Sequence, residues 1–154
     1  MTSYKDDAVL FIVATGDADQ CALPQPITLP STSGYISNII SHDTACGTAR
    51  TPWEIRAKPG QHIRIRLIDF SLSASNRQSA GESSRKSVYG TVKERSQSTT
   101  IYAGRARDTQ VYTSRSHTVQ IVIFTLSPLQ GYFLLYYEGM IGTNGHSKRW
   151  YRYM

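Results

Sequence analysis

The segment QHIRIRLIDF, residues 61–70, places two arginines among aliphatic residues in an alternating pattern. Successive side chains of a β-strand point to opposite faces, so Arg64 and Arg66 share one face and the aliphatic residues share the other. Two neighbouring guanidinium groups can bind sulfate, phosphate or carboxylate groups. The same pattern also fits a scaffold strand whose polar face is solvated, and the sequence leaves both interpretations open.

The distribution of charge raises the question of an anionic partner. The net charge is +6, with one Lys against five Asp in residues 1–49 and sixteen Lys or Arg against six Asp or Glu in residues 50–154. This asymmetry suits a sulfated glycan, an acidic protein, a nucleic acid or a membrane surface, and equally a plain solvated surface. The candidate contacts are two close pairs, Arg64 with Arg66 and Arg105 with Arg107. A nucleic acid is not favoured, because nothing in the sequence places stacking aromatic residues beside these arginines.

Residues for catalysis or metal binding form no recognised pattern. The sequence contains no G-x-S-x-G, no phosphate-binding glycine loop and no H-E-x-x-H. The four histidines lack the spacing of a zinc site. Asp69, at the end of a predicted strand, is interpreted as a hydrogen-bonded structural residue. We therefore expect a protein that is not an enzyme and needs no cofactor.

The two cysteines, Cys21 and Cys46, allow two interpretations. A disulfide between them would stabilise the fold by about 3 kcal/mol in the loop-entropy model. Two buried free thiols in a cytosolic protein are the alternative. The spacing alone does not decide between them.

Alternation of apolar and polar residues recurs along the chain, whereas helical periodicity is nearly absent. It predicts nine strands, at residues 8–14, 33–40, 52–57, 62–70, 87–94, 99–104, 109–114, 117–126 and 131–139. Nine short strands are typical of a β-sandwich or jelly roll. The last strand is apolar on both faces, which indicates a central position. No apolar run reaches the roughly 18 residues of a membrane-spanning helix.

The strands at residues 62–70 and 117–126 are interpreted as partners that contribute aliphatic faces to the core. Burial of one Ile or Leu stabilises a fold by about 1.5–3 kcal/mol. KPGQ, residues 58–61, has the composition of a turn. The predicted core consists of Trp53, Ile63, Ile65, Leu67, Phe70, Val119, Ile121 and Ile123.

Several of these segments together resemble the CUB domain, including its spermadhesin-like forms. The first is Cys46 followed by Pro52, Trp53 and Ile55, and the second is PGQ-x-I-x-I-x-L-x-DF at residues 59–70. VYGTVKE, VYTSRSHTVQIVI and GYFLLYYEG then follow in the order that the family shows. The resemblance covers about residues 21–139 and depends on the joint order and spacing of the segments.

The resemblance implies an all-β, jelly-roll β-sandwich of two antiparallel sheets, a fold found almost entirely in extracellular proteins. It also implies that Cys21 and Cys46 form the family's first disulfide, which would mark an oxidising compartment. On this basis residues 21–139 form a CUB-like domain. Residues 1–20 are an N-terminal extension or first strand, and residues 140–154 form a basic aromatic tail.

The second disulfide of many CUB domains has no counterpart in this sequence. The matching positions hold Ser87 and either Tyr102 or Ala103, so packing must hold that corner of the fold together.

The calcium ligands of many CUB domains are also missing. The family's glutamate aligns with Ser73, and its two aspartates align near Gly90 and Leu126. Because calcium prefers several charged oxygen ligands, we expect no calcium site of the family type.

The leading hypothesis is a non-enzymatic CUB-like module, secreted or on an extracellular face, that binds a protein or a glycan or joins subunits in an assembly. The alternatives are a structural subunit of a larger particle or filament and a basic domain that binds heparin or nucleic acid. Because a disulfide-type fold is expected without a signal peptide, we interpret the chain as a mature form or as one domain of a larger protein.

Overall fold

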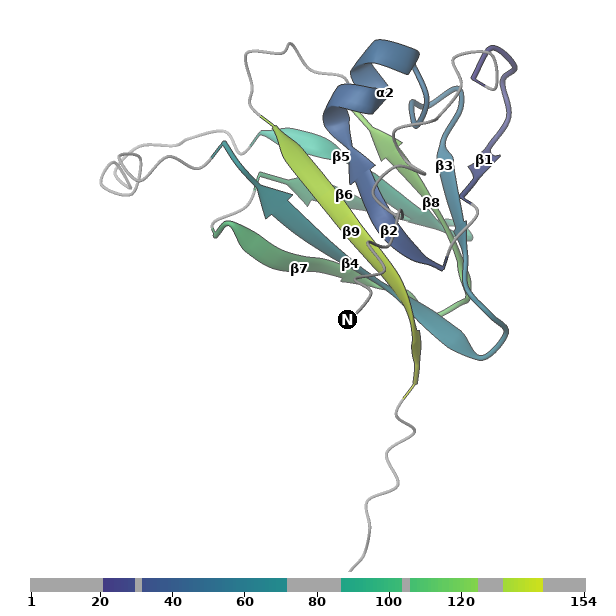
Figure 1. Cartoon of the computed structure of the whole chain (residues 1–154). Coiled ribbons are helices and arrows are strands. Elements are labelled where there is room, and N and C mark those ends of the chain that lie inside the picture. Colours follow the sequence, from purple (N-terminus) through teal and green to yellow (C-terminus); the bar gives the residue numbers. More distant parts are fainter. Residues whose placement is uncertain (1–20, 30–31, 72–86, 104–105, 125–131, 143–154) are drawn as a thin grey trace, which may run out of the picture.

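Two β-sheets lie face to face in the computed structural model, with one short helix at one end (Figure 1). The structure describes residues 21–29, 32–71, 87–103, 106–124 and 132–142. The elements are β1 (Ile27–Thr28), β2 (Ser33–Ser37), α2 (Asn38–Thr44), β3 (Trp53–Arg56), β4 (Gln61–Asp69), β5 (Val88–Glu94), β6 (Gln97–Tyr102), β7 (Asp108–Thr113), β8 (Thr118–Ile123) and β9 (Phe133–Ile141). The all-β sandwich predicted from the sequence is confirmed.

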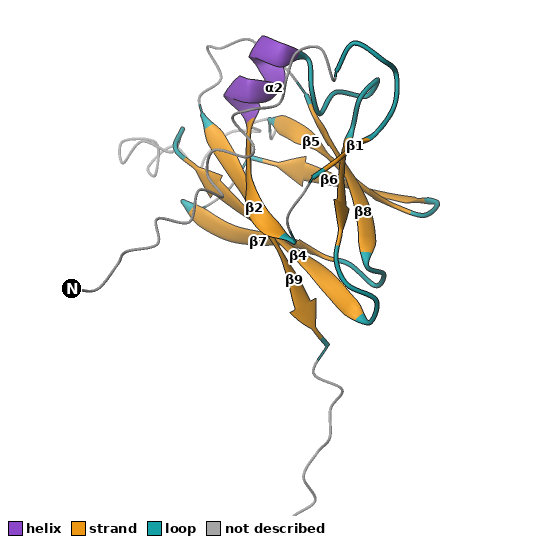
Figure 2. Ribbon diagram, turned by 45° about the vertical axis from the view of Figure 1, so that its right-hand side comes forward, coloured by secondary structure: helices purple, strands orange, loops and turns teal. Residues whose placement is uncertain are grey.

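The chain passes repeatedly from one sheet to the other (Figure 2). One sheet has five strands in the order β1-β3-β8-β5-β6, and the other has four in the order β2-β9-β4-β7. All neighbours are antiparallel except β1 and β3, which are parallel. The central position predicted for the last strand is confirmed, since β9 lies between β2 and β4.

The predicted pairing of the strands at residues 62–70 and 117–126 is wrong. β4 pairs with β9 and β7, whereas β8 pairs with β3 and β5 in the opposite sheet. The apolar faces of β4 and β8 both contribute to the same core. Alternation in sequence reports which face of a strand is buried but carries no information about which strand lies beside it.

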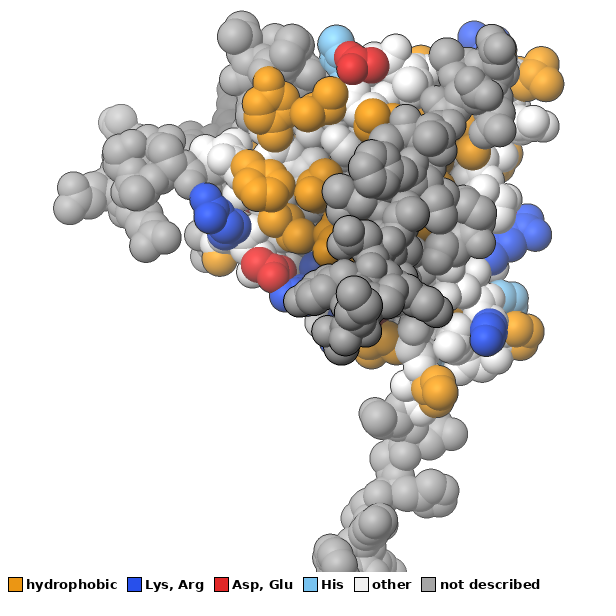
Figure 3. Space-filling model, viewed as in Figure 1, with side chains coloured by type: hydrophobic (Ala, Val, Ile, Leu, Met, Phe, Trp, Pro, Cys, Tyr) orange, Lys and Arg blue, Asp and Glu red, His pale blue; other side chains and the backbone are white. Residues whose placement is uncertain are grey.

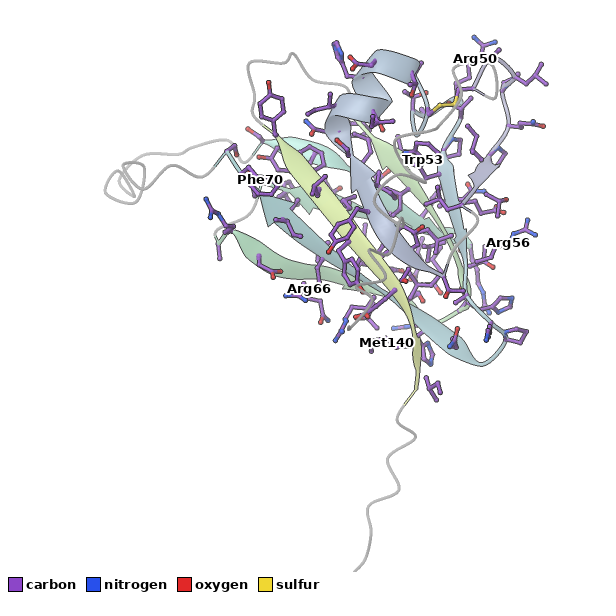
Figure 4. The ribbon with its side chains drawn as sticks, in the orientation of Figure 1. Arg50, Trp53, Arg56, Arg66, Phe70 and Met140 are labelled. Atoms are coloured by element: carbon purple, nitrogen blue, oxygen red, sulfur yellow. A yellow bond between two sulfur atoms is a disulfide. The ribbon has the colours of Figure 1, made fainter. Side chains whose placement is uncertain are left out.

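The core predicted from the alternation is buried with one exception. The side chains that are at most 2% exposed include Trp53, Ile63, Ile65, Leu67, Val119, Ile121 and Ile123. Phe70 was predicted to join them and is 50% exposed (Figure 4). The inward position at the end of β4 belongs to Asp69, which is fully buried and accepts a hydrogen bond from the Tyr89 hydroxyl at 2.9 Å. The period of two therefore turns Phe70 outward.

Other predicted elements also differ from the structure in their bounds or their presence. The strand expected at residues 33–40 ends at Ser37, and α2 follows because the Ser37 side chain caps it by accepting a hydrogen bond from Ile39 N at 3.2 Å. The short β1 was not predicted. β9 includes Met140 and Ile141, the first two residues of the predicted tail, and the strand predicted at residues 8–14 lies outside the described residues.

A tightly packed corner surrounds the disulfide that the resemblance implied. Cys21 and Cys46 are bonded, with their Cα atoms 5.2 Å apart. Gly47 follows in a left-handed conformation, with φ of 76°, and its carbonyl accepts a hydrogen bond from Ile123 N at 2.7 Å. A Cβ atom at Gly47 would lie 2.0 Å from the indole nitrogen of Trp53. Glycine is therefore required here both by the backbone conformation and by the close approach of a buried ring.

Substitution of Gly47 should reveal how much this corner contributes. Gly47→Ala should lower the free energy of unfolding by about 3 kcal/mol or more, because it adds a clash with Trp53 to the strain of a positive φ. Gly60→Ala is the matched control: Gly60 has φ of 85°, and nothing lies within 4 Å of its Cβ position. It should cost about 1–2 kcal/mol. Equal losses for the two variants in urea denaturation would contradict the packing role of Gly47.

Candidate functional site

The paired arginines of β4 lie on the outer face of the four-stranded sheet and are each ion-paired. Arg64 pairs with Glu138, its register partner on β9, and its Nε donates to Glu138 Oε1 at 2.7 Å. Arg66 donates through two nitrogens to both carboxylate oxygens of Asp108 on β7. The four side chains carry no net charge together. The ion pairs reduce the positive charge that this face offers to an anion, and the contact predicted for Arg64 and Arg66 stays a prediction.

The structure describes only one member of the second predicted pair, Arg107. Arg105 lies outside the described residues. Arg107 is exposed just before β7, and its carbonyl accepts a hydrogen bond from Asp69 N at 2.8 Å. Among the residues that the structure describes, Arg107 forms no ion pair. Its side chain does not line either of the two pockets described below.

A basic groove, formed by residues that the sequence did not single out, opens at one end of the sandwich. It has a volume of about 600 Å³ and lies between the turn before β4, the end of β5 and the turn between β7 and β8. Ala57 N donates to His117 O at 2.8 Å and joins two of these segments. The groove is lined by the cations Lys93, Arg95 and Arg115, by His62 and His117, and by small or polar residues. In the described part of the chain, none of the three cations has an ion-pair partner.

The carboxylate of Glu94 connects two of the segments that form this groove. It accepts hydrogen bonds from Arg115 N at 2.9 Å, from Ser116 N at 2.5 Å and from the Tyr112 hydroxyl at 2.6 Å. Glu94 is 6% exposed. Burial on its own would raise the pKa of Glu94, but the hydrogen bonds from Ser116, Tyr112 and Arg115 outweigh it and lower the pKa to about 2. The ionised carboxylate thus ties the end of β5 to the turn that carries Arg115.

Arg95 occupies a strained backbone position at the edge of the groove. Its φ is 54°, in the hairpin turn between β5 and β6, where Glu94 pairs with Gln97. Two-residue hairpin turns usually place glycine, asparagine or aspartate at such positions. A left-handed conformation costs a residue with a side chain about 1–2 kcal/mol. Strain that persists at the mouth of a groove is consistent with a role for the arginine there.

Three residues that the resemblance to CUB domains singled out, Ser87, Gly90 and Ala103, can be described directly. A Cβ atom at Gly90 would lie 2.1 Å from the Val122 carbonyl oxygen, so this backbone leaves no room for an aspartate. Ala103 N donates to Ser87 O at 2.8 Å, so a backbone hydrogen bond joins the segments that match the positions of the second disulfide of many CUB domains. Ser73 and Leu126 lie outside the described residues.

The described residues contain no cluster of three or more His, Cys, Asp or Glu that could hold a metal ion. Among the helices that the structure describes, none is long and apolar enough to cross a membrane. Comparison of the chain with models of known protein families gave no match, and comparison with curated proteins gave none either. Membership of the CUB family therefore stays a prediction.

The sequence did carry a weak signal for the groove. Lys93 and Arg95 flank Glu94 at the end of a predicted strand, and Arg115 lies in the polar stretch TSRSH between two others. Cations at strand ends lie together only if the turns share one end of the sandwich. That condition depends on the sheet topology.

The low pKa of Glu94 predicts how stability changes with pH. Because its folded-state pKa lies below the ordinary value of 4.5, its stabilisation is present above about pH 4.5 and is lost as the pH falls towards 2. Glu94→Gln should lower the free energy of unfolding at neutral pH by on the order of 3 kcal/mol, and its stability should fall less than that of the wild type between pH 4.5 and 2.

Asp108→Asn is the control, because it removes a carboxylate from an ion pair in which both side chains are more than 40% exposed. It should change stability by about 1 kcal/mol or less. Denaturant titrations at a series of pH values measure both variants. A Glu94→Gln profile parallel to that of the wild type would contradict the role given to this carboxylate.

Proposed function

We propose that the protein is a non-enzymatic, CUB-like binding domain of an extracellular compartment, and that it recognises a sulfated glycan through the basic groove. The Cys21–Cys46 disulfide supports an oxidising compartment. The two-sheet sandwich and the ordered motif series support the CUB-like assignment. The groove is the observation on which the choice of ligand depends.

The difference between two sets of cations carries this proposal. Arg64 and Arg66 are neutralised by carboxylates on neighbouring strands. Lys93, Arg95 and Arg115 surround a concave surface, and among the described residues no carboxylate pairs with them. Unpaired cations around a concavity concentrate positive potential and attract an anionic ligand. Sulfate oxygens would accept charge-assisted hydrogen bonds from these side chains.

The other side chains of the groove favour a glycan over a protein or a nucleic acid. No described lining residue is Phe, Tyr or Trp, so the groove offers no platform on which bases could stack. Val119 is the one aliphatic residue among those described there, whereas protein interfaces depend on buried aromatic or aliphatic anchors. Ser116, Thr118 and Gln120 supply the hydroxyl and amide groups that suit a sugar chain.

Paired charge-removal variants test this proposal with heparin as the probe. Lys93→Ala/Arg95→Gly removes two cations from the groove, and the glycine suits the positive φ of residue 95. Its affinity for heparin should fall roughly tenfold, the equivalent of about 1.4 kcal/mol. Arg64→Ala/Arg66→Ala removes the same charge from the ion-paired face, and its affinity should fall less than about threefold at physiological salt.

Titration calorimetry at fixed ionic strength measures both affinities, and thermal unfolding verifies that each variant is folded. Equal losses for the two variants would indicate attraction by net charge alone. No heparin binding by the wild type at low salt would remove the proposal.

We propose assembly as the second candidate function, because one sheet edge is unusually free of charge. β6 is the outermost strand of the five-stranded sheet in the described part of the chain, and its sequence QSTTIY has no Lys, Arg, Asp or Glu. Most of its residues are exposed. Natural edge strands usually carry charges, prolines or bulges that prevent pairing with another chain. An uncharged edge supports addition of a strand from a second copy.

Light scattering with a single charge insertion tests this second candidate. The wild type should have a mass above the 17.2 kDa of one chain at high concentration. Thr99→Lys, at an exposed position of β6, should restore the monomer, because a lysine on the edge opposes strand pairing. Thr113→Lys, on the edge strand β7 of the other sheet, is the control and should leave the mass unchanged. A monomeric wild type would exclude edge-to-edge assembly.

A further inference from the structure

We propose that the outer face of the four-stranded sheet is a second binding site, which takes a neutral oligosaccharide across Tyr35 and Tyr136. This site is separate from the basic groove and does not depend on the function proposed for it. It is a shallow pocket of about 340 Å³, lined by Tyr35, Tyr136, the two ion pairs of this face and Ile68. Figure 3 looks onto this sheet, where hydrophobic side chains show near the start of β9 and the end of β4, beside acidic and basic ones.

The strand register aligns flat, polar side chains in one row across the whole sheet. Tyr35 on β2 is opposite Tyr136 on β9, which is opposite Arg66 on β4, which is opposite Gln110 on β7. The centroids of the two tyrosine rings are 5.0 Å apart, and the ring planes are inclined by 48°. Three strand spacings give the row a length of about 14 Å. A short run of sugar rings could therefore lie along it at right angles to the strands.

The hydrogen-bonding groups beside the rings match the hydroxyls of a sugar. Glu138 and Asp108 are acceptors held in place by Arg64 and Arg66. Each guanidinium has five N–H groups, so donors remain after its carboxylate is bound. The Tyr136 hydroxyl donates to Glu138 Oε2 at 3.2 Å. Adjacent sugar hydroxyls both donate and accept hydrogen bonds, and this fixed set of donors and acceptors is complementary to them. The apolar C–H face of a sugar ring would then pack against the tyrosine rings.

The charge of this face selects an uncharged ligand. Two arginines and two carboxylates cancel, so the face attracts neither polyanions nor polycations. The Tyr136 hydroxyl is uncharged at neutral pH, since its pKa, ordinarily 10, is raised further by burial and by the neighbouring Glu138 carboxylate. Binding here should be insensitive to salt, whereas binding at the basic groove should weaken as salt rises.

The side chains of the row also favour a saccharide over a protein as the ligand. Tyrosine and arginine also anchor protein interfaces, but there they lie in well-packed, fully desolvated pockets. The row lies in a shallow pocket, and each of its members, Tyr35, Tyr136, Arg66 and Gln110, has a polar group that can hydrogen-bond. The strongly exposed apolar side chains next to or within the paired strands β4 and β9 lie at the two ends of that pair, Phe70 and Tyr132 at one end and Ile141 at the other, while the row crosses the middle of the sheet. We therefore argue for the saccharide.

Nuclear magnetic resonance titration of the full chain with linear neutral hexasaccharides tests the proposal. The probes are maltohexaose, cellohexaose, mannohexaose and chitohexaose. At least one should shift amide signals in β2, β9, β4 and β7, with the same midpoint at low and at high salt. Tyr136→Ala should weaken this binding roughly tenfold or more, and Gln110→Ala should weaken it less.

Two further variants keep the result interpretable. If Tyr136→Ala does not fold, Tyr35→Ala on the edge strand β2 makes the same test, since β2 has a neighbour on one side only within the described residues. Lys93→Ala/Arg95→Gly should bind the hexasaccharide as the wild type does, while its affinity for heparin falls roughly tenfold. No shift with any of the four probes, shifts confined to the groove, or binding unchanged in both tyrosine variants would each overturn the proposal. Hexasaccharide binding by a wild type that binds no heparin at low salt would overturn only the function proposed for the groove.

Discussion

One buried carboxylate joins the two sheets at the end where the basic groove opens. Glu94 belongs to the five-stranded sheet, and it accepts a hydrogen bond from Tyr112 of the four-stranded sheet and from the backbone of the turn between β7 and β8. A buried carboxylate is costly unless several donors satisfy it. Here the donors fix the position of Arg115 relative to Lys93 and Arg95, so the requirement to satisfy one anion arranges three cations.

The surroundings of each cation, and not its presence in the sequence, decide what it can do. Arg64 and Arg66 attract attention because they alternate with isoleucines, yet the register opposite them supplies Glu138 and Asp108. The cations of the groove lie at strand ends, where turns bring few side chains within reach. The same residue types therefore give a neutral, hydrogen-bonding face along the strands and a positively charged groove at their ends. Two chemically different surfaces on one small sandwich follow from this difference.

Local patterns in the sequence predicted what depends on local physics. The alternation of Ile63, Ile65 and Leu67 was sufficient to identify buried residues, and Pro59 with Gly60 was sufficient for the turn, where Gln61 N donates to Lys58 O at 2.9 Å. The disulfide followed from the resemblance. The prediction that Phe70 joins the core was wrong. An aromatic residue is usually buried, but the period of two of β4 points Asp69 towards the core and Phe70 away from it. The short helix α2 escaped notice because seven residues show too little of a helical period.

Properties that depend on the order of strands could not be predicted in this way. β4 pairs with β7 and β9, and the residues of β4 themselves do not indicate which strands lie beside it. The groove requires residues near positions 61, 94 and 115 to meet, and their meeting depends on turns that share one end of the sandwich. The repeated passage of the chain between the sheets also has a kinetic consequence. β2 has β9 as its only strand neighbour among the described elements, and Tyr35 lies opposite Tyr136, about 100 residues later. During synthesis the four-stranded sheet can therefore form completely only after nearly the whole domain has left the ribosome. Until then the apolar face of β4 is not covered by its own sheet partners, and chaperones would be needed to protect it from aggregation.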